Sequence, residues 1–256
     1  MFATRIAPAS RFAVALALIA ALGLVPVQAG AQPWRGEKVT GSGVTRTETR
    51  NVSGFHGVVL GVSARVEVRQ GDSEGLSITG DDNIVPLVET VVVDGALKIR
   101  WKGNANVSAS HQPLAIVVSA KRIDALTVGG TGRIHAARLE SPRLRATIGG
   151  AGEIALDALD ADAVSVTIGG SGRLAVAGRA DALEVAVAGS GELAAGKLES
   201  RRATIALQGS AQADVWAQES LDATIAGSGE ITYRGKPQVN RTVVGSGTIR
   251  QAREAS

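Results

Sequence analysis

The residues best suited to acid–base chemistry in this chain are carboxylates that gather in its second half. Asp157, Asp160 and Asp162 form the densest acidic cluster, and Asp181 lies further along the same region. In an extended segment, Asp160 and Asp162 point to the same side. Glycoside hydrolysis requires two carboxyl groups about 5–10 Å apart with different pKa values. One hypothesis is therefore a polysaccharide-active enzyme, and the alternative is a solvated turn without a catalytic role.

Trp216 and Arg234 are the residues best suited to bind a ligand without reacting with it. Trp216 follows Val215, and strand alternation turns its indole away from the interior, near Arg234 of the next repeat. An exposed indole can stack on a sugar ring. The same side chain could equally cover a corner of the fold or contact the N-terminal segment. Ligand contact by Trp216 and Arg234 is thus a prediction with a purely structural alternative.

Other site chemistries find little support in the residue pattern. His56, His111 and His135 are scattered without metal-ligand spacing, so no metal site is expected. The chain has no cysteine, which excludes disulfides and thiolate chemistry. No glycine turn is followed by the Gly-Lys-Ser/Thr of a phosphate-binding loop, so no nucleotide cofactor is expected. The formal net charge is only +3 and no cluster of cations occurs, so no nucleic-acid partner is expected either.

The elements that must position these residues are revealed by glycines. Short glycine turns recur at 129–132, 149–152, 169–172, 188–191, 208–211, 226–229 and 244–247. Their second residues are 20, 20, 19, 20, 18 and 18 positions apart. A period of this size is typical of a repeat architecture in which each unit packs on its neighbours. Glycine suits such corners because it accepts positive φ and the close approach of another backbone.

Aligning the repeats on these turns gives columns of like residues. An aliphatic residue precedes each turn: Val128, Ile148, Ile168, Val187, Leu207, Ile225 and Val243. A second apolar column follows the turns: Ile134, Ile154, Leu174, Leu193, Ala213, Ile231 and Ile249. Polar residues alternate with both columns, and 45% of the chain is hydrophobic but only 3% aromatic. These features predict an all-β protein, a right-handed parallel β-helix (β-solenoid) with a narrow aliphatic interior and a less regular N-terminal β part.

Residues 1–31 have the pattern of a secretory signal peptide. Arg5 and Arg11 precede an apolar stretch, and Ala29 and Ala31 provide small residues for cleavage before Gln32. The apolar stretch is too short to span a bilayer comfortably. A signal peptide is therefore expected, with an N-terminal membrane anchor as the alternative. After cleavage no membrane span is expected.

The remaining chain is expected to form one structural unit. Residues 32–50 read as a flexible segment and a first strand, and 51–250 as a single solenoid domain followed by a polar tail at 251–256. Within the domain, 51–120 reads as an irregular β part and 121–250 as seven coils. The last coil carries Arg241 where earlier coils have aliphatic residues, and it ends in the polar run 250–254, which is expected to discourage end-to-end stacking.

Three details are expected within the irregular part. Asp94-Gly95 lies between two apolar runs and predicts a β-hairpin. Residues 84–88 include Pro86, which disfavours a central strand and indicates a helical turn or bend. Trp101 shares one strand face with Leu97 and is expected to be part of the core.

Several short segments together resemble a known family. The runs VSGFHGV at 52–58, VEVRQGD at 66–72, GDDNI at 80–84 and VET at 88–90, with the Gly-Ser-Gly turns, resemble the head GIN domain family of putative autotransporter adhesins. The resemblance covers about residues 40–250. It implies a bacterial, exported, β-helical domain of unknown function, and it supplies no agreed catalytic or binding residues.

The sequence thus favours an exported, non-enzymatic β-solenoid of the cell envelope or surface. We expect an adhesin-like binding module in the periplasm or outside the cell, with an envelope glycan or a protein as partner. A polysaccharide-active enzyme that uses the carboxylates around Asp160 is one alternative. A structural module that assembles through its exposed strand edges is the other.

Overall fold

The computed structural model describes residues 38–253, apart from residues 104 and 110–111 and the side chains of 108 and 109. The predicted signal peptide at 1–31 and the start of the 32–50 segment lie outside the described residues. The described chain consists of strands and one short helical turn, η1 (Val85–Leu87), at the position where a turn or bend is predicted. None of its helical structure is long and apolar enough to cross a membrane.

The strands divide into an N-terminal group and a repeat group. The first group is β1 (Lys38–Thr40), β2 (Thr45–Arg50), β3 (Gly57–Leu60), β4 (Arg65–Gln70), β5 (Gly75–Asp81), β6 (Val88–Val93), β7 (Ala96–Trp101), β8 (Asn106–Ala109) and β9 (Ala115–Ala120). The second group is β10 (Ala125–Val128), β11 (Arg133–Ala136), β12 (Leu139–Glu140), β13 (Arg143–Gly150), β14 (Glu153–Gly170), β15 (Arg173–Gly189), β16 (Glu192–Gly209), β17 (Gln212–Gly227), β18 (Glu230–Arg234), β19 (Gln238–Gly245) and β20 (Thr248–Gln251).

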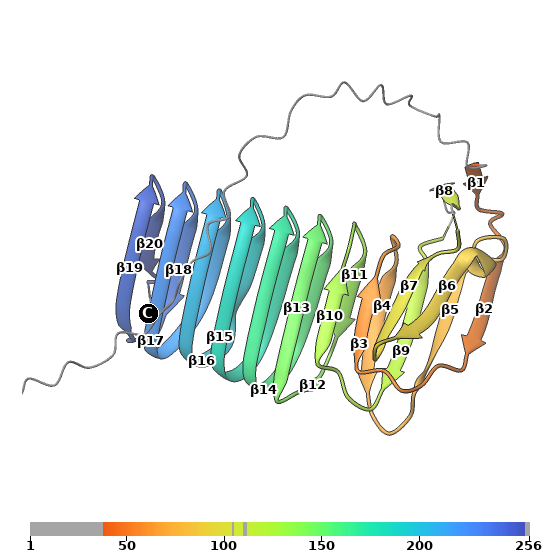
Figure 1. The fold of residues 1–256 in the computed structure, drawn as a ribbon, viewed down its shortest axis with the longest axis horizontal. Coiled ribbons are helices and arrows are strands. Elements are labelled where there is room, and N and C mark those ends of the chain that lie inside the picture. Colours follow the sequence, from red (N-terminus) through yellow and green to blue (C-terminus); the bar gives the residue numbers. More distant parts are fainter. Residues whose placement is uncertain (1–37, 104, 110–111, 254–256) are drawn as a thin grey trace, which may run out of the picture. The chain divides into compact units, whose positions relative to one another are not determined.

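The repeat strands wind as successive coils with three faces (Figure 1). The first face contains β10, β13, the second halves of β14 to β17, and β19, all in parallel. The second face contains β11, the first halves of β14 to β17, β18 and β20. The third face is short and starts with β12, which pairs with the middle of β14.

Equivalent apolar residues of successive coils meet in register in the interior. Ile148 pairs with Val128 on one side and Ile168 on the other, and the series continues through Val187 to Leu207, Ile225 and Val243. Every member before Val243 is at most 1% exposed. The predicted β-solenoid with a dry aliphatic interior is therefore confirmed.

The glycine turns stack on one another through their backbones. The amide of Ser171 donates to the carbonyl of Gly150 at 3.0 Å, and the amide of Ser190 donates to that of Gly170 at 2.9 Å. A Cβ atom on Gly189 would lie 2.6 Å from the Gly170 carbonyl oxygen. Glycine recurs here because the turn of the preceding coil fills the space that a side chain needs.

Two coils in the N-terminal part continue the same column, out of chain order. Leu60 of β3 pairs with Val128 of β10 on one side and with Ile99 of β7 on the other. On the second face β4 lies between β11 and β9 in the same way. Figure 1 shows orange β3 and β4 between green β10 and β11 and yellow β7 and β9. The segment at 51–120 therefore begins the column as well as covering it.

Antiparallel strands close the N-terminal end of the column. β5 pairs antiparallel with β9 and with β2, and β6 forms a hairpin with β7. Asp94 and Gly95 have φ values of 53° and 73°, which confirms the predicted hairpin turn. Trp101 is only partly buried and packs against the core from its edge. The antiparallel strands β2, β5 and β6 cap this end of the column and protect its edge from pairing with further strands.

At the C-terminal end of the solenoid, the exposed edge strand β19 carries the charged residue Arg241. Among the described residues β19 pairs only with β17, and all its residues are exposed. Arg241 stands in register with the buried Ala223, so the last coil places a guanidinium where earlier coils have apolar side chains. An inward-pointing charge of this kind opposes edge-to-edge association.

A small separate sheet of β1 and β8 was not predicted from the sequence.

Candidate functional site

The third face carries one outward column that contains both predicted ligand-binding residues. We call this set the third-face column; its members, one per coil, are Glu140, Asp160, Arg179, Glu199, Trp216 and Arg234. Trp216 enters it because β17 is shorter than β16 at this corner. Ala195 pairs with Val215 and Glu199 with Trp216, so residues 196–198 of β16 have no partner in β17.

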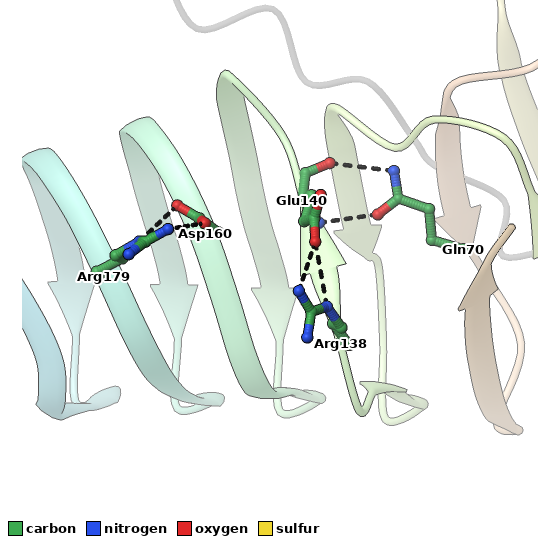
Figure 2. Close-up of polar contacts among 5 residues, drawn as sticks. All are labelled: Gln70, Arg138, Glu140, Asp160 and Arg179. Atoms are coloured by element: carbon green, nitrogen blue, oxygen red, sulfur yellow. Dashed lines mark hydrogen bonds and ion pairs between the residues drawn. The ribbon is translucent and has the colours of Figure 1, made fainter.

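Asp160 and Arg179 form a two-pronged ion pair in this column. The Arg179 Nε and Nη2 atoms donate to the two carboxylate oxygens at 2.9 and 2.5 Å (Figure 2). The hydrogen bonds from Arg179 lower the pKa of Asp160 and raise the pKa of Arg179. A carboxylate held this way keeps its negative charge, which suits electrostatic recognition rather than proton donation.

This pair predicts how Asp160 titrates. Replacing Arg179 by Gln is expected to raise the pKa of Asp160 toward its ordinary value, because the charge-assisted hydrogen bonds are lost. Side-chain carboxyl NMR across an acid titration measures it, with Arg145→Gln on the first face as a control. Since the folded-state pKa is lowered, the pair stabilises the fold above the unfolded-state pKa and ceases to do so as pH falls through the folded-state value. An Asp160 titration unchanged by Arg179→Gln would contradict the assignment.

At its N-terminal end the third face is closed by a side chain instead of a strand. The Gln70 amide accepts from the Glu140 backbone N–H at 2.8 Å and donates to the Glu140 carbonyl at 3.1 Å (Figure 2). The β3–β4 coil has no strand on the third face, and the Gln70 side chain makes the two backbone hydrogen bonds to Glu140 that such a strand would make. The Glu140 carboxylate also pairs with Arg138 at 2.7 Å. These contacts hold the first member of the third-face column in place.

Trp216 and Arg234 are neighbours, as expected. Their backbones pair in register between β17 and β18, and Trp216 is half-buried while Arg234 is exposed. The Trp216 carbonyl accepts a hydrogen bond from the hydroxyl of Ser200, which is fully buried, at 2.5 Å. Arg234 pairs with Asp214 at 3.2 Å. These contacts hold the Trp216 backbone and the Arg234 guanidinium in place, and ligand contact by the two residues stays a prediction.

A groove of about 540 Å³ runs beside Arg234 on the second face. The small side chains of Ala175 and Ala194 line it, and Arg173, Lys197 and Arg234 bring positive charge to it. Gly196 leaves room for the Asp214 carboxylate, because a Cβ there would lie 2.2 Å from Oδ2. The groove is therefore an open, mixed-charge surface that adjoins the third-face column.

The structure brings three of the four aspartates of the predicted acidic cluster to one depression and leaves Asp157 apart from them. Asp160 is held by Arg179. Asp157 instead pairs at 2.8 Å with His135 of β11, on the second face. Asp162 and Asp181 line one surface depression together with Asp160, and Arg179 and Arg201 line it as well. A general acid for glycoside hydrolysis needs a raised pKa, and the lowered pKa of Asp160 is the opposite.

Metal ligands do not gather in the part of the chain that the structure describes. No three histidine, aspartate or glutamate side chains there are grouped so that they could hold an ion. His56 pairs with Asp124 at 2.8 Å, and His135 faces outward to Asp157 as its alternation with Ile134 predicts. The residue His111 lies outside the described residues.

Sequence reasoning missed two residues that shape the site. Arg179 lies one repeat after Asp160, so extending the column alignment to the third face would have paired them. Gln70 gives no such signal, because it belongs to a coil outside the regular period and acts through its side-chain amide.

Comparisons with known proteins place this architecture in a family. The family model described as putative auto-transporter adhesin, head GIN domain, matches residues 54–237. No curated protein matches the chain. Among solved structures, a putative lipid binding protein from Parabacteroides distasonis is 27% identical with a TM-score of 0.73, covering 85% of this chain and 100% of that one.

Two further solved structures share the fold at lower identity. A putative adhesin from Bacteroides fragilis is 24% identical with a TM-score of 0.78, covering 84% of this chain and 100% of that one. A putative adhesin from Parabacteroides merdae is 22% identical with a TM-score of 0.67, covering 84% and 99%. The family match spans most of the solenoid and includes the third-face column. The chain therefore belongs to the family of putative auto-transporter adhesins with a head GIN domain.

Proposed function

We propose that this protein is an exported, non-enzymatic binding module of the cell envelope or surface that holds an envelope glycan or a protein against its third face. The observation that supports this most is the register of Trp216 with Arg234 beside an open groove. An indole next to a guanidinium offers an apolar stacking plane and hydrogen-bond donors together, as carbohydrate and protein ligands require.

Export is part of the proposal. It is supported by the signal-peptide pattern of residues 1–31 and by the family, whose members are described as adhesins. The product would act in the periplasm or on the cell surface. Its stability there depends on packing and backbone hydrogen bonds, because the sequence contains no cysteine for a disulfide.

Binding is favoured over the two alternatives by specific contacts. A polysaccharide-active enzyme needs a protonated carboxyl group, and Asp160 is held ionised by Arg179. A module that assembles through its strand edges meets antiparallel strands at one end and exposed Arg241 at the other. Light scattering across a concentration series is expected to show no growth of oligomers.

The proposal predicts that Trp216→Ala weakens ligand binding about tenfold or more, since a central tryptophan commonly dominates the energy of an interface. Retention of peptidoglycan, envelope polysaccharides, lipid vesicles and envelope proteins by the full chain is the measurement. Lipid is included because the Parabacteroides distasonis relative is described as a putative lipid binding protein. Arg234→Gln is expected to weaken binding as well.

Arg241→Gln is the matched control, because Arg241 is exposed on β19, outside the third-face column. It is expected to leave binding unchanged. A screen in which no ligand is retained would contradict the proposal. Release of sugar products that stops in Asp160→Ala and Asp162→Ala would replace it with the enzyme hypothesis.

A further inference from the structure

A second pocket, remote in sequence from the third-face column, lies at the N-terminal end of the solenoid. It has a volume of about 440 Å³. Most coils join the first and second faces through a tight turn, but between β7 and β9 the chain also contains β8. The pocket forms where Val107, Pro113 and Leu114 lie beside Ser63 and Thr131, in the turns that precede β4 and β11. It therefore exists because one coil departs from the repeat.

One wall of this pocket is apolar. Ile84 and Leu114 are 1% and 4% exposed, and the partly buried Trp101 and Val107 complete the wall. The backbone N–H of Arg65 donates to the Leu114 carbonyl at 2.8 Å, which joins this wall to β4. An indole and three aliphatic side chains around such a volume are typical of sites for apolar parts of small ligands.

The other wall carries two adjacent cations. Arg65 and Arg133 are directly paired in register between β4 and β11, and both line the pocket. Like charges directly opposite each other are unfavourable in a sheet. Further along the same outward column the charges are complementary, since Arg133 pairs with Glu153 at 2.5 Å and Arg173 with Glu192 at 3.1 Å.

Arg65 has no such compensation. Its register neighbour on the other side is Ala115, and the nearby Glu67 is taken by Arg69 at 2.8 Å. The guanidinium of Arg65 makes no hydrogen bond or ion pair with the described residues, and no acidic side chain is among those that line the pocket. The pocket thus combines an apolar wall with an uncompensated positive charge.

We propose that this pocket binds an amphiphile with one anionic head group, whose carboxylate or phosphate sits against Arg65 and Arg133 and whose hydrocarbon part contacts Trp101 and Leu114. Guanidinium groups match both head groups, because each offers oxygens to parallel N–H donors. The inference is independent of the proposed role of Trp216, since it uses none of the third-face residues.

Titration calorimetry of the full chain with four compounds tests it: dodecanoate, dodecyl phosphate, dodecanol and inorganic phosphate. At least one of the two anionic amphiphiles is expected to bind about tenfold or more tightly than dodecanol and inorganic phosphate. The tighter of the two identifies the head group. Arg65→Gln is expected to weaken that binding about tenfold or more, as expected for a lost charge-assisted contact.

Control variants separate the two walls. Arg145→Gln, an exposed arginine on the first face, is expected to leave binding unchanged, and Trp101→Leu to weaken the amphiphile but not inorganic phosphate. Arg65 is exposed, so its variant is expected to fold, which circular dichroism verifies. Equal binding of dodecanol, equal binding of inorganic phosphate, no binding of either anionic amphiphile, or an Arg65→Gln variant with unchanged affinity would each overturn the proposal.

Discussion

Gly170→Ala is expected to lower the free energy of unfolding by about 3 kcal/mol or more, through backbone strain and a steric clash. Gly170 has φ of +128°, a conformation that residues with a Cβ rarely adopt. The new methyl group would lie 2.6 Å from the Gly150 carbonyl oxygen of the preceding coil. Relieving that contact would displace the carbonyl that accepts from the Ser171 amide at 3.0 Å.

The neighbouring glycine provides the control for this experiment. A Cβ on Gly169 would meet only the Ile148 carbonyl oxygen, at 3.9 Å, which is ordinary contact. Gly169→Ala is therefore expected to change stability by no more than about 0.5 kcal/mol. Urea unfolding followed by circular dichroism compares the two variants. Equal stability of both would show that close stacking of the turns does not determine where glycine is required.

Ile168→Ala is expected to cost about 2–5 kcal/mol, the range for removing a large aliphatic side chain from a core. Ile168 is fully buried and lies in register between Ile148 and Val187. Its Cγ2 atom is 2.6 Å from where a Cβ on Gly191 would be, so it also fills space against the next turn. Backbone hydrogen bonds between coils hold the neighbouring residues in place, which limits collapse into the cavity.

Thr167→Ala is the matched control for the core substitution. Thr167 is exposed, one residue before Ile168, and pairs with Ala186 in the next coil. Alanine is thus already tolerated in this outward column, and the variant is expected to lie within about 0.5 kcal/mol of the wild type. The same unfolding experiment measures both. A cost for Thr167→Ala as large as for Ile168→Ala would contradict the assignment of inward and outward faces.

Much of the repeat region could be predicted because the period carries the register. Once the glycine turns are aligned, Ile148, Ile168 and Val187 must meet, since parallel coils pair like with like. The same alignment turns Trp216 outward next to Arg234. The alignment could not predict whether Trp216 binds a ligand, because an indole at this position could equally cover a corner of the fold.

The order of the N-terminal coils could not be predicted. Leu60 and Ile99 lie on strands with similar apolar alternation, and nothing in that pattern says which strand stands next to Val128. The chain forms the coil of β3 and β4, leaves it for the antiparallel cap, and returns on its far side through β7 and β9. Only long-range pairing decides such an arrangement, because local periodicity is the same for every order.

By itself the sequence determined the solenoid, its inward columns and the positions of its turns, because the short period repeats the same turn and the same apolar residues at every coil. The tertiary structure decided which charges meet. It paired Asp160 with Arg179, which lowers the pKa of that carboxyl group, and it set Arg65 beside Arg133, with no ion-pair partner for Arg65 among the described residues. Charge pairing depends on distances of a few ångströms between side chains of different coils, and one-residue changes in coil length shift these distances without altering the apolar pattern.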